Sequence, residues 1–125
     1  MRWIFLFAAI SGMSSVILGA FGAHGLKGRL SAEMMNAYQT GVEYQIYHSL
    51  ALLITAYFFY QWPESGWLKW STYLFCTGIL LFSGSLYVLS LTGIRLAGPI
   101  TPIGGLFLIM GWLLLTIGLW EVTRT

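Results

Sequence analysis

Residues 31–50 read Ser31-Ala-Glu-Met-Met-Asn-Ala-Tyr-Gln-Thr-Gly-Val-Glu-Tyr-Gln-Ile-Tyr-His-Ser-Leu50. Their polar side chains distinguish this segment from the wholly apolar sequence of an ordinary transmembrane helix. At about 100° per residue, a helix through them gathers polar side chains in one stripe, which consists of Asn36, Thr40, Glu43 and Tyr47, with Tyr44 and His48 on its shoulder. The stripe leads into residues 50–60, which are almost wholly apolar. We therefore expect a helix that starts at the membrane surface and then enters the membrane. Polar side chains that reach membrane depth should face other helices or trapped water.

The composition around this segment is that of an integral membrane protein. The chain has 125 residues, of which 58% are hydrophobic and 8% are charged, and its mean hydropathy is +0.78. Four apolar windows can cross a hydrocarbon core of about 30 Å, namely residues 3–21, 43–61, 70–91 and 103–120. Little chain remains for a soluble domain.

We predict an all-α fold, in which a polytopic membrane protein forms an antiparallel four-helix transmembrane bundle with short loops. It is a single transmembrane domain over residues 1–125, with spans at approximately 3–23, 32–61, 67–91 and 102–121. The second of these helices would be about 45 Å long, which exceeds the hydrocarbon core. Its first part is therefore expected to be interfacial.

Residues with known preferences mark the helix ends. Ser31 is a good N-cap for the second helix, and Gly25 suits the position after the end of the first. The segment Trp62-Pro-Glu-Ser-Gly66 reads as a tight turn between the second and third helices. Thr101 reads as an N-cap followed by Pro102 at the first helical position.

Small residues form two faces that permit close helix packing. The first face consists of Ala8, Gly12, Ser15, Gly19 and Gly22, and the second of Gly104, Gly111 and Gly118. Such faces join helices within one chain or between chains. We expect a homo-oligomer that forms through a small-residue face.

Several function classes find no support in the residues. The net charge of +2 is scattered without a basic run, so a nucleic-acid partner is not expected. Cys76 is the only cysteine and lies inside the third span, where a small core residue is the expected role. Two histidines and a carboxylate could ligate a metal or a haem, but their spacing matches no such motif. We expect no catalytic residue, no metal and no cofactor.

An up-and-down order brings the end of the first span, the start of the second, the end of the third and the start of the fourth to one membrane face. The polar residues there form a candidate pocket that consists of His24, Glu43, Tyr44, Gln45, Tyr47, His48, Ser83, Ser85, Tyr87, Thr101, Gly104 and Gly105. Two interpretations of Glu43 are open. Its charge is met either by the dipole at the start of the fourth helix or by a basic residue at the interface, where Lys27, Arg29 and Arg95 lie.

Four segments in order resemble the signature of a known family. They are Gly19-Ala-Phe-Gly-Ala-His24, Gln39-Thr-Gly-Val-Glu-Tyr-Gln45 with His48, Leu81-Phe-Ser-Gly-Ser-Leu-Tyr87, and Thr101-Pro-Ile-Gly-Gly105 with Gly111-Trp112. They are similar to those of the YgdD/YwdK-like small membrane proteins, a bacterial family of unknown function (domain of unknown function 423). The resemblance implies a four-span protein of the bacterial inner (plasma) membrane with cytoplasmic termini. It carries no catalytic residue over to this chain.

Two function classes stay open on the sequence. In the first, the pocket binds or passes a small solute, a proton or a lipid head group, with Glu43 and His48 as the titrating groups. In the second, the protein is structural: its polar motifs only hold the helices together, and its glycine faces bind a partner or a second copy. An intramembrane enzyme or haem protein ranks third. A cavity between Glu43, His48 and Tyr87 favours binding, and a dry, fully hydrogen-bonded cluster favours the structural class. An absorbance band in the visible range would favour the third.

Overall fold

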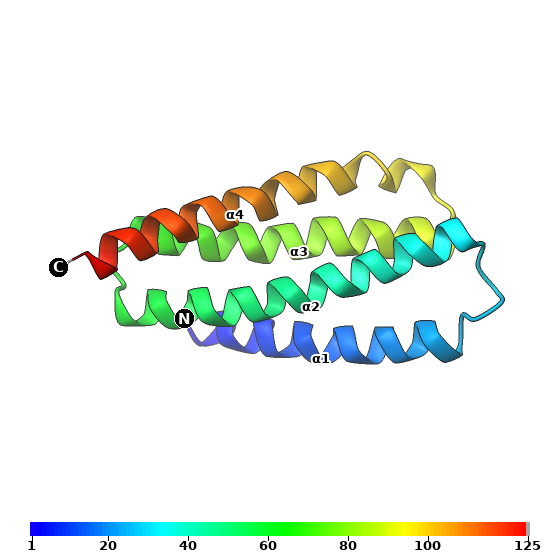
Figure 1. The fold of residues 1–125 in the computed structure, drawn as a ribbon, viewed down its shortest axis with the longest axis horizontal. Helices are drawn as coiled ribbons and strands as arrows, with labels where there is room; N and C mark the ends of the chain where they lie inside the picture. The colour runs from blue at the N-terminus through cyan, green and yellow to red at the C-terminus, as the bar shows by residue number, and fades with distance from the viewer. Residues whose placement is uncertain (125) are drawn as a thin grey trace.

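A computed structural model describes residues 1–124 and shows four long α-helices that run back and forth along one axis (Figure 1). They are α1 (Arg2–His24), α2 (Ala32–Gln61), α3 (Gly66–Thr92) and α4 (Ile100–Thr123), and a 3₁₀ turn, η1 (Arg95–Ala97), precedes the last. Both termini lie at the same end as the α2–α3 turn (Figure 1). The all-helical prediction is confirmed.

The helices form an open row in chain order. Each long helix packs against the one before it, whereas α1 and α3 touch only lightly, as do α2 and α4. No Cα atom of α1 comes within 8 Å of one in α4, although a closed bundle would place these helices side by side. The outer helices turn their small faces inward, α1 toward α2 and α4 toward α3, so neither faces the other. Two grooves result, one between α1 and α3 over α2, and one between α2 and α4 over α3.

The glycines of α4 confirm the predicted close-packing face. A Cβ atom on Gly104 would lie 2.4 Å from the backbone nitrogen of Phe82. On Gly111 and Gly118 it would lie 2.8 Å and 2.7 Å from the side chains of Phe75 and Leu68. This face is therefore occupied by α3 of the same chain and is not free for a second copy.

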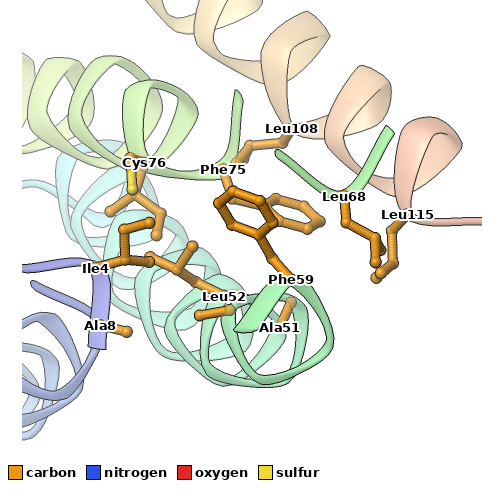
Figure 2. Packing of buried hydrophobic residues seen from close by; sticks show 12 residues of the cluster. Ile4, Ala8, Ala51, Leu52, Phe59, Leu68, Phe75, Cys76, Leu108 and Leu115 are labelled. Carbon is orange, nitrogen blue, oxygen red and sulfur yellow. The ribbon is translucent and has the colours of Figure 1, made fainter. Parts of the chain in front are cut away.

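Most of the apolar core lies in the half of the molecule nearer the termini. Figure 2 shows its side chains from close by. All four helices contribute to it, and its largest fully buried apolar side chains are Ile4, Leu52, Leu68 and Phe75. Cys76 is buried in the same cluster, which is the role expected for it. The polar contacts between helices are concentrated in the other half.

Three of the helical segments are long and apolar enough to cross a membrane: α1, α3 and the segment Arg95–Thr123 that contains α4. Helix α2 falls short of the same hydropathy, because Gln45, His48 and several tyrosines interrupt its apolar run. Gln45 and His48 are buried between α2 and its neighbours. Gln45 and His48 are thus shielded by the other helices, whereas Tyr47, Tyr57 and Tyr60 are exposed.

Only some of the helix ends agree with the predictions from the sequence. Ser31 caps α2 as predicted, since its side chain accepts a hydrogen bond of 3.1 Å from the nitrogen of Met34. The prediction that Thr101 caps the fourth helix is wrong, because α4 already begins at Ile100 after Pro99. Proline is tolerated in a first helical turn, whose N–H groups have no intrahelical partner, so neither Pro99 nor Pro102 delays the start.

The connection after α1 also differs from the expectation. The helix ends at His24, but Gly25 keeps a right-handed conformation with φ −79°. The left-handed position is taken three residues later by Gly28, at φ +77°. The reversal of the chain is therefore spread over the loop.

Candidate functional site

The polar stripe of α2 lies opposite its buried face. Asn36, Glu43 and Tyr47 are exposed, and Thr40 is only half-buried. The buried face instead carries Tyr38, Gly41, Gln45, His48, Ser49 and Leu52. The expectation concerned the part of the stripe at membrane depth. His48 on its shoulder does face α3 and α4, whereas Asn36, Glu43 and Tyr47 do not face other helices. Most of its polar members lie in the first turns of α2, the part expected outside the hydrocarbon core, where water can satisfy them.

On the side toward α1 and α3, polar side chains of α2 join three helices. Gln45 Nε2 donates a hydrogen bond of 2.8 Å to the carbonyl of Ser11, and its Oε1 accepts one of 2.5 Å from the hydroxyl of Tyr87. The hydroxyl of Ser49 donates to that of Ser11 at 2.7 Å. We call Ser11, Gln45, Ser49, Ser83 and Tyr87 the polar lock.

Ser83 completes the polar lock one turn away. Its hydroxyl donates to the carbonyl of Gly41 at 2.7 Å, and a Cβ atom on Gly41 would lie 2.9 Å from the ring of Tyr87. Nearby, the hydroxyl of Tyr38 donates to the carbonyl of Leu18. Within residues 1–124, every buried side-chain nitrogen or oxygen has a hydrogen-bond partner. The buried side chains of the polar lock therefore make their hydrogen bonds with protein groups.

On the other side of α2, an open groove of about 520 Å³ runs between α2 and α4. We call it the aromatic groove. It is lined by Tyr44, Tyr47 and His48 of α2, Phe82 of α3, and Gly105, Leu108, Ile109 and Trp112 of α4.

His48 is held by partners at both ring nitrogens. The indole N–H of Trp112 lies 3.0 Å from His48 Nε2, and His48 Nδ1 lies 2.8 Å from the carbonyl of Tyr44. An indole nitrogen can only donate and a carbonyl can only accept. His48 must therefore be the neutral tautomer with its proton on Nδ1, and Nε2 accepts from Trp112.

Stacked rings stiffen the walls of the aromatic groove. The ring of Tyr44 stacks on Phe82 with centroids 4.6 Å apart, and the rings of His48 and Trp112 meet edge to face at 5.9 Å. In the described part of the chain the hydroxyls of Tyr44 and Tyr47 have no hydrogen-bond partner, and these side chains are 39% and 54% exposed. The groove thus combines an ordered aromatic wall with unused polar groups.

Trp112 lines the aromatic groove but was not among the predicted pocket residues, although Gly111-Trp112 follows the fourth of the segments that resemble the family. The other tryptophans lie near the end of the molecule that holds the termini, as an interfacial belt would: Trp3, Trp62, Trp67, Trp70 and Trp120. Trp112 instead lies at the midpoint of α4 and is 47% exposed. A tryptophan so far from either end of the helix was the signal available in the sequence.

The remaining predicted site residues do not enter the aromatic groove. His24 is exposed at the end of α1, where Nδ1 lies 3.0 Å from the carbonyl of Ala20. The hydroxyls of Ser85 and Thr101 meet at 2.6 Å and join α3 to α4. Gly104 is buried against α3. The residues predicted as one pocket are thus divided among the polar lock, the aromatic groove and the helix ends.

Glu43 lies on the α1 side and not at the start of α4. It lines a shallow groove with Gly19, Gly22 and Ala23 of α1 and Tyr38, Gln39 and Val42 of α2. The prediction that the dipole at the N-terminus of the fourth helix stabilises the Glu43 carboxylate is wrong. One residue along a helix turns the side chain by about 100°, so Glu43 points away from the groove that its neighbour Tyr44 lines.

Long apolar helices joined by buried polar contacts define a small polytopic membrane protein. The sequence comparisons place the chain within that class. Residues 18–105 match the family model described as a protein of unknown function (DUF423). The UPF0382 inner membrane protein YgdD of Escherichia coli is 45% identical over 123 residues, which cover 98% of this chain and 93% of that protein.

A UPF0382 membrane protein of Staphylococcus haemolyticus is 46% identical over 117 residues, or 94% of each chain. One of Staphylococcus saprophyticus is 43% identical over 122 residues, which cover 98% of this chain and 100% of the relative. The chain belongs to this family of membrane proteins, which confirms the resemblance seen in its motifs. No solved structure matches it.

Proposed function

We propose that this protein is a four-span inner-membrane protein that binds a lipid-like molecule from the bilayer in the aromatic groove. The observation that carries the proposal is the groove itself. It is open between α2 and α4, its walls are ordered by stacked rings, and it presents two tyrosine hydroxyls without partners in the described chain. Ligand sites commonly pair apolar walls with a few polar groups.

The protein has four spans if α2 crosses the membrane alongside the three candidate spans. Helix α2 packs between α1 and α3, and both of these are candidate spans. Its buried polar side chains are satisfied by α1, α3 and α4 and by α2 itself, which is the condition for polar residues at membrane depth. The 30 residues of α2 also leave about three turns to project from the core.

Cytoplasmic termini are proposed from the family resemblance, because the charges give no preference. Arg2, Lys69 and Arg124 lie at the terminal end and Lys27, Arg29 and Arg95 at the other, which is a tie under the positive-inside rule. A C-terminal fusion to green fluorescent protein should fluoresce, and a fusion to alkaline phosphatase should be inactive. The opposite pair of results would place the termini outside.

Binding is favoured over passage of protons through His48. Both ring nitrogens of His48 are engaged, so a proton could enter only after the bond from Trp112 breaks. Glu43, the other titrating candidate, is exposed beside α1. The two groups therefore do not form a relay.

A structural or interaction protein is the second candidate. The observation in its favour is the polar lock, in which Gln45, Tyr87 and Ser83 have their hydrogen bonds within the chain. A second copy would have to meet the uncovered outer helices, since the α4 glycines are occupied. Cross-linking of single cysteines on the exposed face of α1 would detect such a dimer.

The binding proposal is tested by filling the groove. The protein is extracted from a bacterial inner membrane in mild detergent, and bound lipid is measured by native mass spectrometry. A Cβ atom on Gly105 would meet the Phe82 ring at 3.6 Å, an ordinary contact, so Gly105→Leu should occupy the groove without displacing α3. Gly84→Leu is the matched control, because a Cβ atom there meets nothing within 4 Å and Gly84 lies outside this groove.

We expect a retained lipid on the unchanged protein and on Gly84→Leu, and its loss from Gly105→Leu. Equal retention in all three proteins would contradict the proposal. Tyr47→Ala, which removes an exposed wall of the groove, provides a second test should Gly105→Leu unfold. Unchanged lipid retention in that variant would likewise count against binding here.

A further inference from the structure

The aromatic groove has no charged lining residue. Its eight lining residues include no lysine, arginine, aspartate or glutamate. The nearest acidic residue in sequence, Glu43, lines the groove on the α1 side. A phosphate or a carboxylate would therefore find no counter-ion among the lining residues, and burying an unpaired charge is costly.

The polar groups that remain for a ligand are few and neutral. The indole N–H of Trp112 is already used on His48 Nε2, and His48 Nδ1 on the carbonyl of Tyr44. This leaves the hydroxyls of Tyr44 and Tyr47, each of which can donate one hydrogen bond and accept others. They are suited to a carbonyl or hydroxyl oxygen.

The depth of the groove points to the same chemistry. Along α4, which begins at Ile100, the groove extends from Gly105 to Trp112. At 1.5 Å per residue, this is from about 7 Å to about 18 Å below the start of the helix. A phosphate head group stays at the interface, whereas the polar end of an uncharged lipid can lie deeper among the acyl chains.

From these features we infer that the aromatic groove selects an uncharged lipid whose small polar group is a carbonyl or a hydroxyl. Diacylglycerols and isoprenoid quinones share this chemistry. The polar group contacts the hydroxyls of Tyr44 and Tyr47, and the apolar part lies along Phe82, Leu108 and Ile109. This inference rests on the proposed lipid-binding function and specifies its ligand class.

The test uses the full-length protein in nanodiscs of phosphatidylethanolamine and phosphatidylglycerol. These contain equal, small amounts of dioleoylglycerol and of a long-chain ubiquinone. Lipids that stay bound are identified by native mass spectrometry and compared with their share of the bilayer. We expect one of the two uncharged lipids to be enriched about tenfold, equivalent to about 1.4 kcal/mol. Whichever of the two is enriched shows whether the groove selects the diacylglycerol or the quinone.

Two variants and one control tie the enrichment to the groove. Gly105→Leu should abolish it and Gly84→Leu should not. Tyr44→Phe combined with Tyr47→Phe keeps both rings and removes both hydroxyls, so it should lower the enrichment several-fold while leaving the melting temperature unchanged. Undiminished enrichment in the tyrosine variant would overturn the assignment of the polar contact.

The outcomes separate this inference from the proposed function. Groove-dependent retention of phosphatidylglycerol or phosphatidylethanolamine, in place of the uncharged lipids, would overturn the ligand class and keep lipid binding. If the unchanged protein retains no lipid, or if Gly105→Leu retains as much as the unchanged protein, both proposals are overturned.

Discussion

The two sides of helix α2 use polar residues in opposite ways. Toward α1 and α3, Gln45 fills both its donor and its acceptor with partners from other helices. Toward α4, His48 is fixed by Trp112 and by its own helix, and the neighbouring tyrosine hydroxyls have no partner in residues 1–124. Gln45 and His48 are three residues apart, yet one belongs to a closed network and the other to an open groove. Whether the neighbouring helices complete the hydrogen bonds decides the role of a polar residue in a membrane helix.

The largest effect is expected from Gly104, which holds α4 against α3 beneath the aromatic groove. Gly104→Val should lower the free energy of unfolding by about 3 kcal/mol, because its Cβ atom would collide with the backbone of Phe82. Gly105→Val, one residue further, should change it by less than about 1 kcal/mol, because its Cβ atom meets only ring atoms at 3.6 Å. Unfolding in mixed micelles with rising dodecyl sulfate, followed by circular dichroism, measures both. Equal losses would contradict the difference between the packed and the open side of α4.

The polar lock should show the next largest effect. Gln45→Leu leaves the Tyr87 hydroxyl and the Ser11 carbonyl without their partner and should cost about 2 kcal/mol in the same assay. Adding Tyr87→Phe removes one stranded group and should restore about 1 kcal/mol. Simple additivity of the two losses would show that the bond between Gln45 and Tyr87 does not stabilise the fold. Lipid retention should be unaffected by Gln45→Leu if the two sides of α2 are independent.

Trp112→Phe should cost about 1 kcal/mol, because it removes the single hydrogen bond to His48 Nε2 and keeps the ring. Nitrogen-15 NMR of the histidine side chains provides a sharper readout. In the unchanged protein His48 should be the Nδ1–H tautomer, and in the variant this preference should weaken. Trp120→Phe, at an exposed position near the end of α4, is the control and should leave the His48 signals unchanged. An Nε2–H tautomer in the unchanged protein would refute the assigned geometry.

The smallest effect is expected at Glu43. Glu43→Gln should alter the free energy of unfolding by less than about 0.5 kcal/mol, because the side chain is exposed beside α1. Thermal melting in detergent and in lipid is sufficient to test this. A loss of about 1 to 3 kcal/mol would instead mean that its carboxylate is held by a charged hydrogen bond.

The sequence predicts what depends on local preference. The start of α2 follows from the capping side chain of Ser31, and the contact between α3 and α4 follows from Gly104, Gly111 and Gly118. Both features can be read within a single helix. The position of α4 relative to α1 depends on which side of α2 is contacted by α1 and which side of α3 is contacted by α4. Periodicity within one helix does not contain that information.

The candidate site was predicted less well for the same reason. Helical spacing groups Glu43 with Tyr47 in one polar stripe, but it does not say which side of α2 each neighbouring helix occupies. Gln45 lay outside the stripe, and its two partners come from α1 and α3. Trp112 acquires its role only because Gly111 brings α4 close to Phe75, next to His48. Such contacts between distant segments are fixed by tertiary packing.

The absence of contact between α1 and α4 has a consequence for synthesis. Each of α2, α3 and α4 packs against the helix made immediately before it, and α1 makes no contact with α4, so the first helix does not have to wait for the last one. Local contacts of this kind favour rapid folding, and chains acquire structure from the N-terminus as they are made. A nascent chain that has released α3 already contains every partner of Gln45. The arrival of α4 then adds Trp112 beside His48, so the groove is the last part of the molecule to form.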